Sequence, residues 1–345
     1  MFSTYHQTSC PTSDCEMEEI EEVEAQSGAS VPLLGMLTLG VVACCGLVAL
    51  RDLSPVWELG VHWSLHYLFI ALAILVIAFY RGHWRQVSIL SAACCYLGWL
   101  TQPWLLLAPI TLGPAHGQGG EFSRRARVVS WNVWEANRQF DAVRQWIESE
   151  DPDVIALYEV VPEMDAALQW LRTTYPYHLE RPAHGGAGIA VYSRIAGSRL
   201  RTEDFGWPRQ PAVVLELPRD GEGNEPMQLV AMHALSPLPV WRTRIRDQQL
   251  TALARWVANQ RGPICVCGDL NTTAWTSSFQ QLRQAGFRDS RHGSGNWASW
   301  PSRLGWAGIS IDHALYTPQC LVTGRTVHYN ALGSDHFPVL FTLAY

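Results

Sequence analysis

The stretch Pro263-Ile264-Cys265-Val266-Cys267-Gly268-Asp269-Leu270-Asn271 joins a short apolar run to two polar side chains directly behind it. The first five residues predict a buried strand, because a bounded apolar run of this length is typical of a strand in a packed sheet. Cys265 and Cys267 alternate around Val266, so both thiols face one side of that strand and are expected to pack in the core. Asp269 and Asn271 follow the strand's end, where a rigid sheet can hold functional side chains in place.

Three other stretches repeat this arrangement of a strand followed by a polar side chain. They are Ser130-Trp131-Asn132, Leu157-Tyr158-Glu159-Val160 and Ser334-Asp335-His336-Phe337-Pro338. Taken singly, each has an ordinary explanation as a turn or a capped loop. Taken together, they predict a carboxylate, amide and imidazole cluster in one cleft, because ligands at strand ends can converge while the strands supply rigidity.

Outward from these stretches, short apolar runs alternate with amphipathic helices from about residue 124 to residue 345. This alternation is typical of a mixed α/β domain. Helices are predicted at 140–149 and 240–259. Strands are predicted at 127–131, 153–158, 189–192, 213–217, 228–232, 263–267, 309–316, 322–328 and 339–343.

The chain before residue 124 has a different character. Residues 1–30 carry seven acidic and no basic side chains, which predicts a disordered acidic tail. Three uncharged runs follow at 31–50, 61–80 and 87–112, each long enough to cross a bilayer as a helix. The third is broken by Gln102, Pro103 and Pro109. The sequence therefore predicts about three transmembrane helices, a linker at 113–123 and a catalytic domain at 124–345.

Basic residues beside these runs bear on orientation. Arg81 and Arg85 lie between the second and third runs and favour a cytoplasmic position for that loop. This predicts an integral membrane protein whose large domain is extracytoplasmic. Three arginines after the third run favour the opposite orientation: Arg124, Arg125 and Arg127.

Charge and composition exclude some functions. The chain contains no lysine, which excludes Schiff-base chemistry and a phosphate-loop lysine. From residue 121 onward, 22 arginines balance 22 acids, and this argues against a broad surface for non-specific DNA binding. Arg242, Arg244 and Arg246 form one local basic group, which a solvated helix face explains equally well.

With Ile311-Asp312-His313 placed before the last stretch, the ordered motifs resemble those of the endonuclease/exonuclease/phosphatase superfamily, the DNase I-like enzymes. The resemblance covers about residues 127–345. It implies a four-layer α/β sandwich, with two packed mixed β-sheets flanked by helices. The segment Ser299-Trp300-Pro301 is similar to that of membrane-attached bacterial members of this superfamily.

The resemblance implies a divalent-metal site. Glu159 matches the acid that binds the catalytic cation, and Asn132 and Asp335 match positions that complete or support that site. Hard oxygen ligands of this kind suit Mg²⁺ or Mn²⁺. The cation would neutralise a phosphate oxygen during attack.

The resemblance also implies catalytic roles. His336 matches the histidine beside the scissile phosphate, and Asp312 matches the carboxylate that orients it. Asp269 and Asn271 match the pair that positions the nucleophilic water. His233 matches a histidine that contacts the phosphate, although the hydroxyl or amide residue often found before it is absent here. His313, the neighbour of Asp312, is expected to point to the opposite face of its strand.

These residues predict a membrane-anchored, metal-dependent phosphoester hydrolase, most simply a phosphodiesterase. The substrate stays open between a lipid headgroup, a nucleotide and a nucleic acid. Trp297, Trp300 and Trp306 could stack a base or sugar, or enter a headgroup layer. The alternatives are a degenerate membrane-attached domain that only binds a ligand, and an extracytoplasmic nuclease. A transporter is disfavoured, because the three uncharged runs contain no acid or arginine.

Overall fold

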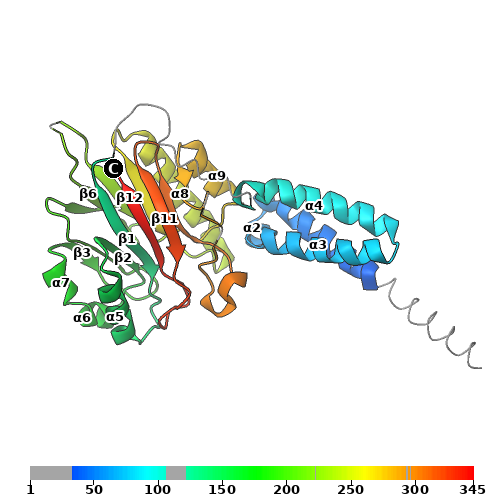
Figure 1. Cartoon of the computed structure of the whole chain (residues 1–345), viewed down its shortest axis with the longest axis horizontal. Coiled ribbons are helices and arrows are strands. Elements are labelled where there is room, and N and C mark those ends of the chain that lie inside the picture. The colour runs from blue at the N-terminus through cyan, green and yellow to red at the C-terminus, as the bar shows by residue number, and fades with distance from the viewer. Residues whose placement is uncertain (1–32, 106–121, 222, 293, 296) are drawn as a thin grey trace, which may run out of the picture. The chain divides into compact units, whose positions relative to one another are not determined.

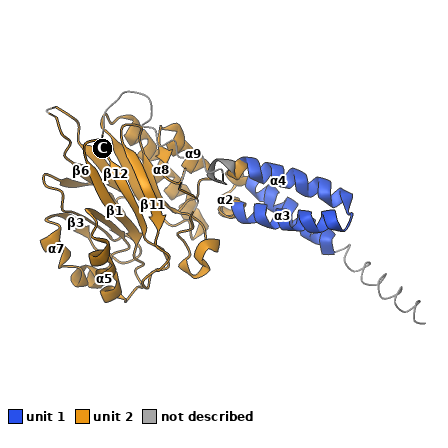
Figure 2. Ribbon diagram, in the orientation of Figure 1, with its two compact units in different colours: residues 1–49, 65–99 blue, residues 50–64, 100–345 orange. Residues whose placement is uncertain are grey.

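The computed structural model describes residues 33–105 and 122–345, apart from residues 222, 293 and 296 (Figure 1). The predicted acidic tail and most of the predicted linker lie outside these residues. The chain divides into two compact units, shown in Figure 2. The helical unit is Met1–Ala49 with Leu65–Trp99, and the sandwich unit is Leu50–Ser64 with Leu100–Tyr345. The sandwich unit therefore includes a stretch from the region in which we expected only membrane helices and their loops.

The helical unit contains helices at the three predicted places. They are Leu33–Ala49, α3 (Ser64–Tyr80) and most of α4 (Trp84–Leu105). Among the described residues, no one helix combines the length and hydropathy of a membrane span, although α2 (Pro55–Val61) and α3 do so jointly across a 59° bend. An apolar cluster lines the inside of the unit: Leu34, Val41, Ala71, Ile74, Ala78, Leu90 and Ala93.

Two six-stranded sheets make up the body of the sandwich unit. Sheet A has the order β11-β12-β1-β2-β4-β3 and sheet B the order β5-β6-β7-β8-β10-β9. The strands of sheet A are β11 (Leu321–Val327), β12 (Val339–Ala344), β1 (Arg125–Asn132), β2 (Val154–Tyr158), β4 (Ile189–Ser193) and β3 (Tyr177–Arg181). Those of sheet B are β5 (Arg199–Glu203), β6 (Ala212–Leu217), β7 (Met227–Ala231), β8 (Ile264–Asp269), β10 (Asp312–Tyr316) and β9 (Arg288–Asp289).

Both sheets are mixed, and each has one parallel pair near its centre. In sheet A β1 runs parallel to β2, and in sheet B β7 runs parallel to β8, while all other pairs are antiparallel. Parallel strands end at the same edge of a sheet, so the residues that follow each pair lie near one another. The predicted strand at 309–316 is shorter than expected, because only Asp312–Tyr316 joins the sheet and Ile309 forms an isolated bridge with Trp300.

Side chains that alternate along the strands form two apolar layers. Val128 and Val154 of sheet A face inward and share a core with residues of sheet B such as Leu215 and Leu229. Their neighbours Val129 and Ile155 face outward and form a second core under the helices. Successive side chains of a strand point to opposite faces, so a strand that is buried on both faces contributes alternate residues to two different cores.

The second core is covered by helices α5 (Phe140–Glu150), α6 (Pro162–Ala167) and α7 (Leu171–Thr174). In α5 the buried residues are Val143, Trp146 and Ile147, a spacing that places them on one helix face. Near sheet B lie η2 (Val240–Arg242), α8 (Thr243–Ala258) and α9 (Ser277–Gln284), and a further 3₁₀ segment, η3, spans Ser302–Ala307 (Figure 1). The predicted α/β sandwich of two packed mixed sheets with flanking helices is confirmed.

Candidate active site

The strand register brings the predicted residues to one end of the sandwich. In sheet B, Asp312 at the start of β10 pairs in register with Asp269 at the end of β8. In sheet A, Ser130 of β1 pairs with Val339 of β12, so the turn before β12 lies beside the residues that follow Ser130. This turn carries His336. The site is therefore assembled from both sheets.

Asn132 lies at the centre of the arrangement and is fully buried. Its Nδ2 donates to Glu159 Oε1 at 2.9 Å and to Asp269 Oδ2 at 3.1 Å. The same Nδ2 lies 3.5 Å from His336 Nε2. One amide thus joins an acid of sheet A, an acid of sheet B and an imidazole.

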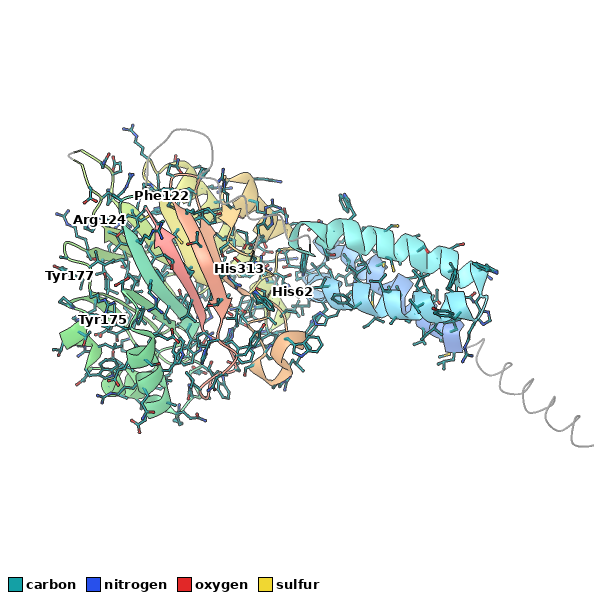
Figure 3. All side chains as sticks on the ribbon, in the orientation of Figure 1. His62, Phe122, Arg124, Tyr175, Tyr177 and His313 are labelled. Carbon is teal, nitrogen blue, oxygen red and sulfur yellow. The ribbon has the colours of Figure 1, made fainter. Side chains whose placement is uncertain are left out.

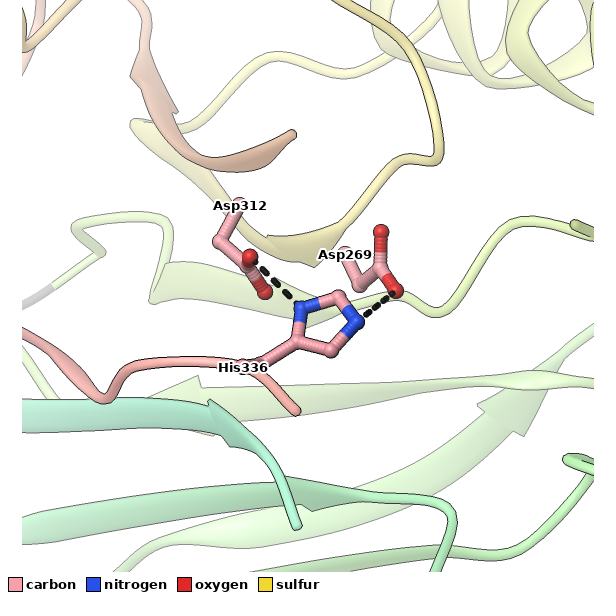
Figure 4. A group of neighbouring side chains, drawn as sticks. All are labelled: Asp269, Asp312 and His336. Carbon is pink, nitrogen blue, oxygen red and sulfur yellow. Dashed lines mark hydrogen bonds and ion pairs between the residues drawn. The ribbon is translucent and has the colours of Figure 1, made fainter. Parts of the chain in front are cut away.

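His336 stands between two carboxylates, as Figure 4 shows. Its Nδ1 lies 2.9 Å from Asp312 Oδ2, and its Nε2 lies 3.6 Å from Asp269 Oδ2. All three side chains are buried. Burial alone would lower the pKa of His336, but Asp312 and Asp269 outweigh it and raise the pKa to about 10. Without a bound cation, His336 is therefore a proton-bearing imidazolium at neutral pH.

The two carboxylates differ in their own titration. Burial raises the pKa of Asp269 to about 6, against the opposing effect of His336. Burial also acts to raise the pKa of Asp312, but its close pairing with His336 lowers the pKa below the usual range. Asp312 therefore stays negatively charged, whereas Asp269 is the carboxylate that can take up a proton near neutral pH.

His233 and Asn271 complete the group. His233 Nε2 lies 3.5 Å from Asp269 Oδ2 and 3.8 Å from Glu159 Oε1, and Asn271 Nδ2 lies 3.3 Å from the same ring nitrogen. Asn271 Nδ2 also donates to the Ala234 carbonyl oxygen at 2.9 Å. His233 is thus part of the cluster and not an isolated core histidine.

The backbone at the ends of β2 and β8 is held in uncommon conformations. Glu159 has φ +60 and Asn271 φ +50, in the left-handed region that non-glycine residues rarely adopt. Gly268 has φ +141, and a Cβ there would lie 2.0 Å from the Met232 carbonyl oxygen. Just behind these residues, Tyr158 OH of sheet A donates to the Cys267 carbonyl oxygen of sheet B at 2.9 Å. The two sheets are therefore fastened together directly beneath the site.

Asp335 is the predicted residue whose side-chain hydrogen bond goes to a residue outside the cluster. Its Oδ2 accepts from Trp300 Nε1 at 3.0 Å. Burial raises the pKa of Asp335, and the nearby Glu159 adds to this effect. No hydrogen bond of the described residues joins the Asp335 side chain to Asn132 or Glu159. Asp335 thus borders the site and fixes the indole of Trp300, whose ring lies 6.3 Å from that of His336.

Two sets of residues could hold a cation. One ligand atom each of Asp269, Asp312 and His336 lies within 4.8 Å of the others. However, the His336 ring directs one nitrogen at each carboxylate, so this set is better explained as a hydrogen-bonded chain. Glu159 with Asn132 offers the oxygen donors that Mg²⁺ and Mn²⁺ prefer. Three carboxylates, Glu159, Asp269 and Asp312, face two imidazoles, and this excess of negative charge also fits a bound cation.

Sequence reasoning missed several residues that support the site. Glu135 N donates to Glu159 Oε2 at 3.1 Å, and Glu135 Oε2 accepts from Gly185 N at 2.7 Å and Gly186 N at 3.0 Å. Glu135 lies three residues after Asn132 in the sequence, and this closeness was the only sequence feature that pointed to a place for Glu135 near the site. His313 behaves as expected: it points away from His336 and its Nε2 lies 2.8 Å from the Thr272 carbonyl oxygen.

Arg246 also differs from expectation. We considered it part of a basic group on a solvated helix face, yet its side chain is completely buried, whereas Arg244 is exposed. The reason is chemical, because Arg246 has buried carboxylate and carbonyl partners, described below.

Comparisons with known proteins agree with this geometry. The model of the Endonuclease/Exonuclease/phosphatase family matches residues 129–336, well over half of the chain. No curated protein matches the chain. Among solved structures, a humanized TDP2 of D. rerio is 16% identical with a TM-score of 0.54, covering 64% of this chain and 99% of its own. The D. rerio TDP2 complexed with single strand DNA product is 16% identical with a TM-score of 0.53 and the same coverage. At this identity the likeness concerns the fold.

Proposed function

The chain belongs to the endonuclease/exonuclease/phosphatase family, and we propose that it is a divalent-metal-dependent hydrolase of phosphoesters, in particular phosphodiesters. The observation that carries the proposal is the buried chain Asp312, His336 and Asp269, which lies one amide away from Glu159. Nucleophilic attack at phosphorus requires three kinds of group. They are a charged imidazole, a fixed carboxylate and an acid that offers hard oxygen donors.

His336 is the group that meets the reacting phosphate. Its Nδ1 is held by Asp312, which fixes the ring orientation, and its Nε2 lies 3.6 Å from Asp269 Oδ2, so Nε2 is the ring atom on the side of the proposed base. An imidazolium there stabilises the negative charge that builds on the phosphoryl oxygens during attack. Asp312 keeps that charge in place, because a buried carboxylate stabilises the protonated ring.

Asp269 is suited to receive a proton from water. Its Oδ1 accepts from the Asn271 backbone N at 2.9 Å, which orients the carboxylate, and its Oδ2 faces the cleft residues. Because burial raises the pKa of Asp269 to about 6, the carboxylate is a base of useful strength near neutral pH. Asn271 and His233 lie beside it and offer polar contacts for a non-bridging oxygen of the phosphate.

Glu159 would hold the cation, with Asn132 beside it. Asn132 now directs Nδ2 at Glu159, while its Oδ1 accepts from Trp134 N at 3.0 Å, so the carboxylate of Glu159 is the principal ligand. A bound Mg²⁺ or Mn²⁺ would supply Lewis-acid neutralisation of a phosphate oxygen.

The charge balance of the cleft favours a diester substrate. Glu159, Asp269 and Asp312 repel anions, and the charge on His336 offsets part of this repulsion. A monoanionic diester is repelled less than a dianionic monoester. Lipid headgroups, nucleotides and nucleic acids all present such a bond. The D. rerio TDP2 structure complexed with a single strand DNA product supports including nucleic acid among the proposed substrates.

We further propose that the helical unit anchors the protein in a membrane, namely a bacterial inner membrane with the sandwich unit extracytoplasmic. Support comes from α3, which has no charged side chain, and from large apolar side chains exposed along it, such as Phe69, Ile70 and Ile77. Arg81 and Arg85 at the α3–α4 turn support the orientation. A reporter active only outside the cytoplasm, fused after residue 345, tests it, and a silent fusion contradicts it.

The function is tested with the full chain in detergent. Turnover of bis-p-nitrophenyl phosphate, phospholipid headgroups and single-stranded and double-stranded DNA is measured with Mg²⁺, with Mn²⁺ and with EDTA. We expect turnover of at least one substrate, and we expect both EDTA and Glu159→Ala to abolish that turnover. Glu163 is an exposed acid on α6, and Glu163→Ala should leave turnover unchanged. Turnover that survives both EDTA and Glu159→Ala would refute the metal-dependent mechanism. An inactive protein that still binds inorganic phosphate would favour a degenerate ligand-binding domain.

A further inference from the structure

The stretch Leu50–Ser64 is distant in sequence from the catalytic strands, yet it belongs to the sandwich unit. It consists of η1 (Arg51–Leu53), helix α2 and the residues that lead into α3, and it has the colour of the sandwich unit in Figure 2. Ser54 caps α2 and Pro55 occupies its first turn, a combination that starts a helix at a fixed place. We call this stretch the entry segment.

Glu58 of the entry segment forms a buried ion pair with Arg246 of α8. Arg246 Nη2 donates to Glu58 Oε1 and, at 2.8 Å, to Asp247 Oδ1. The Arg246 side chain is fully buried, the Glu58 side chain is 12% exposed and that of Asp247 is 36% exposed. Asp247 Oδ1 also accepts from Arg246 Nε at 3.1 Å. Glu58 is the more deeply buried of the two acids, and a buried charge that loses a partner is costly, so Glu58 helps to fix the position of Arg246 together with Asp247.

The other end of the same guanidinium reaches the catalytic loop. Arg246 Nη1 donates to the Asn271 carbonyl oxygen at 2.8 Å. Asn271 adopts φ +50, a conformation that persists only where its surroundings hold it. The held residue is the one whose side chain contacts His233 and the Ala234 carbonyl oxygen. Glu58 therefore lies two contacts from the reacting cluster.

The two residues after Asn271 are held in a similar way. His313 Nε2 lies 2.8 Å from the Thr272 carbonyl oxygen, and His62 Nδ1 of the entry segment lies 3.1 Å from Thr273 Oγ1. Figure 3 labels both histidines. All four of these side chains are buried. Buried side chains thus contact three successive loop residues, Asn271 to Thr273. The contacts to Asn271 and Thr273 involve the entry segment.

We propose that Glu58, acting through Arg246, is a positioning residue for Asn271, so that the entry segment is a working part of the active site. This proposal rests on the proposed function, because it assigns Asn271 a role in the reaction. Neither Glu58 nor Arg246 touches the reacting atoms.

The kinetic test uses the full chain and the substrate that shows turnover. For Glu58→Gln we expect kcat to fall about 10- to 100-fold, because misplacing a catalytic group costs this much, while KM changes by less than about threefold. Glu58→Asp, which keeps the charge, should recover part of the loss. In an Asn271→Ala background, Glu58→Gln should cause no further fall in kcat. A merely structural role would lower the amount of folded protein and leave kcat of the folded fraction unchanged.

Asp52→Asn is the matched control. Asp52 belongs to the entry segment and accepts from Ser277 Oγ at 2.5 Å, but Ser277 lies beyond the loop and the Asp52 side chain is 64% exposed. We expect kcat of this variant to match that of the unaltered protein. Equal loss in Asp52→Asn and Glu58→Gln, or losses that multiply when Glu58→Gln is combined with Asn271→Ala, would overturn the proposal.

Hydrogen exchange separates failure of this proposal from failure of the proposed function. In Glu58→Gln, backbone amides of residues 270–274 should exchange at least about tenfold faster, with β1 and β2 unchanged. Unchanged exchange in this loop overturns the proposal even if the protein is an active hydrolase. Faster exchange in a protein without any phosphoester turnover would support the mechanical link and overturn the proposed function and the catalytic role of Asn271 with it.

Discussion

His336 Nδ1 lies 2.9 Å from Asp312 Oδ2, and this contact joins a turn beside sheet A to the first residue of a strand in sheet B. Both side chains are buried, so little solvent screens their interaction. The pair sets the charge of the imidazole on which the proposed reaction depends.

Asp312→Asn should therefore impair the reaction more than the fold. The amide keeps the shape of the side chain but removes the charge that stabilises the imidazolium. We expect kcat to fall about 100- to 10,000-fold, the range associated with proton-transfer groups. Steady-state kinetics with a phosphodiester checks this. Asp220→Asn, which removes an exposed pair with Arg124, is the control, and an equal effect of both changes would contradict the assignment.

A divalent cation should stabilise the folded protein through Glu159. A ligand that binds only the folded state raises its stability by about 2.7 kcal/mol at a concentration 100 times its Kd. We expect Mg²⁺ to raise the thermal midpoint of the unaltered protein, measured by tryptophan fluorescence. Glu159→Gln should reduce this shift severalfold, and Glu163→Gln should not. A shift of the same size in Glu159→Gln would place the cation elsewhere.

Gly268→Ala should prevent correct closure of the site. Its Cβ would lie 2.0 Å from the Met232 carbonyl oxygen and 2.9 Å from the Tyr158 ring, so the backbone of β7 or β8 must move. We expect a loss of more than about 3 kcal/mol of unfolding free energy. Gly286→Ala is the matched control, because Gly286 also has a positive φ but open space around it. It should cost about 1–2 kcal/mol. Equal losses would contradict the close approach.

The Asp289–Arg291 ion pair should make stability depend on pH in acid. Burial acts to raise the pKa of Asp289, but Arg291 outweighs it and lowers the pKa to about 2. The unfolded value is about 3.9. The folded pKa is the lower one, so the pair's contribution, about 2 kcal/mol, is complete above about pH 4 and is lost as the pH falls toward 2.

The measurement compares thermal midpoints of the unaltered protein and Asp289→Asn between pH 2 and 6. The difference between them should shrink as the pH falls from 4 to 2. Asp141→Asn, at an exposed acid of α5, should track the unaltered protein throughout. A difference that does not change with pH would show that Asp289 titrates normally.

The central strands could be predicted from sequence, because β1, β2, β7 and β8 each contain a short run of mainly apolar, buried residues. The edge strand β11 was also predicted, at 322–328, but the edge strands β3 and β5 could not be. Tyr177–Arg181 and Arg199–Glu203 alternate polar and apolar residues, are only partly buried and lie at the outer edges of sheets A and B. Nothing in their composition distinguishes them from loops.

The site was predictable to a similar extent and for a similar reason. Asn132 ends a buried strand and Glu159 follows one, so their approach could be predicted from the strands, whereas His336 lies in the turn that precedes β12 and not at the end of a strand as expected. Arg246 and Glu58 gave no such signal, since their pairing joins residues 188 positions apart and depends on how α2 packs on α8. Asp335 neighbours His336 in sequence, but its carboxylate accepts from the indole of Trp300, a contact that could not be predicted from the sequence.

The position of β12 in sheet A has a consequence for biosynthesis. Val339–Ala344 is the last described strand to leave the ribosome, yet it lies between β11 and β1, and β1 is the first. Until it emerges, β1 has an unpaired edge and His336 has no partner strand to fix it. Before β12 is made, the unpaired edge of β1 is therefore open to pairing with other chains.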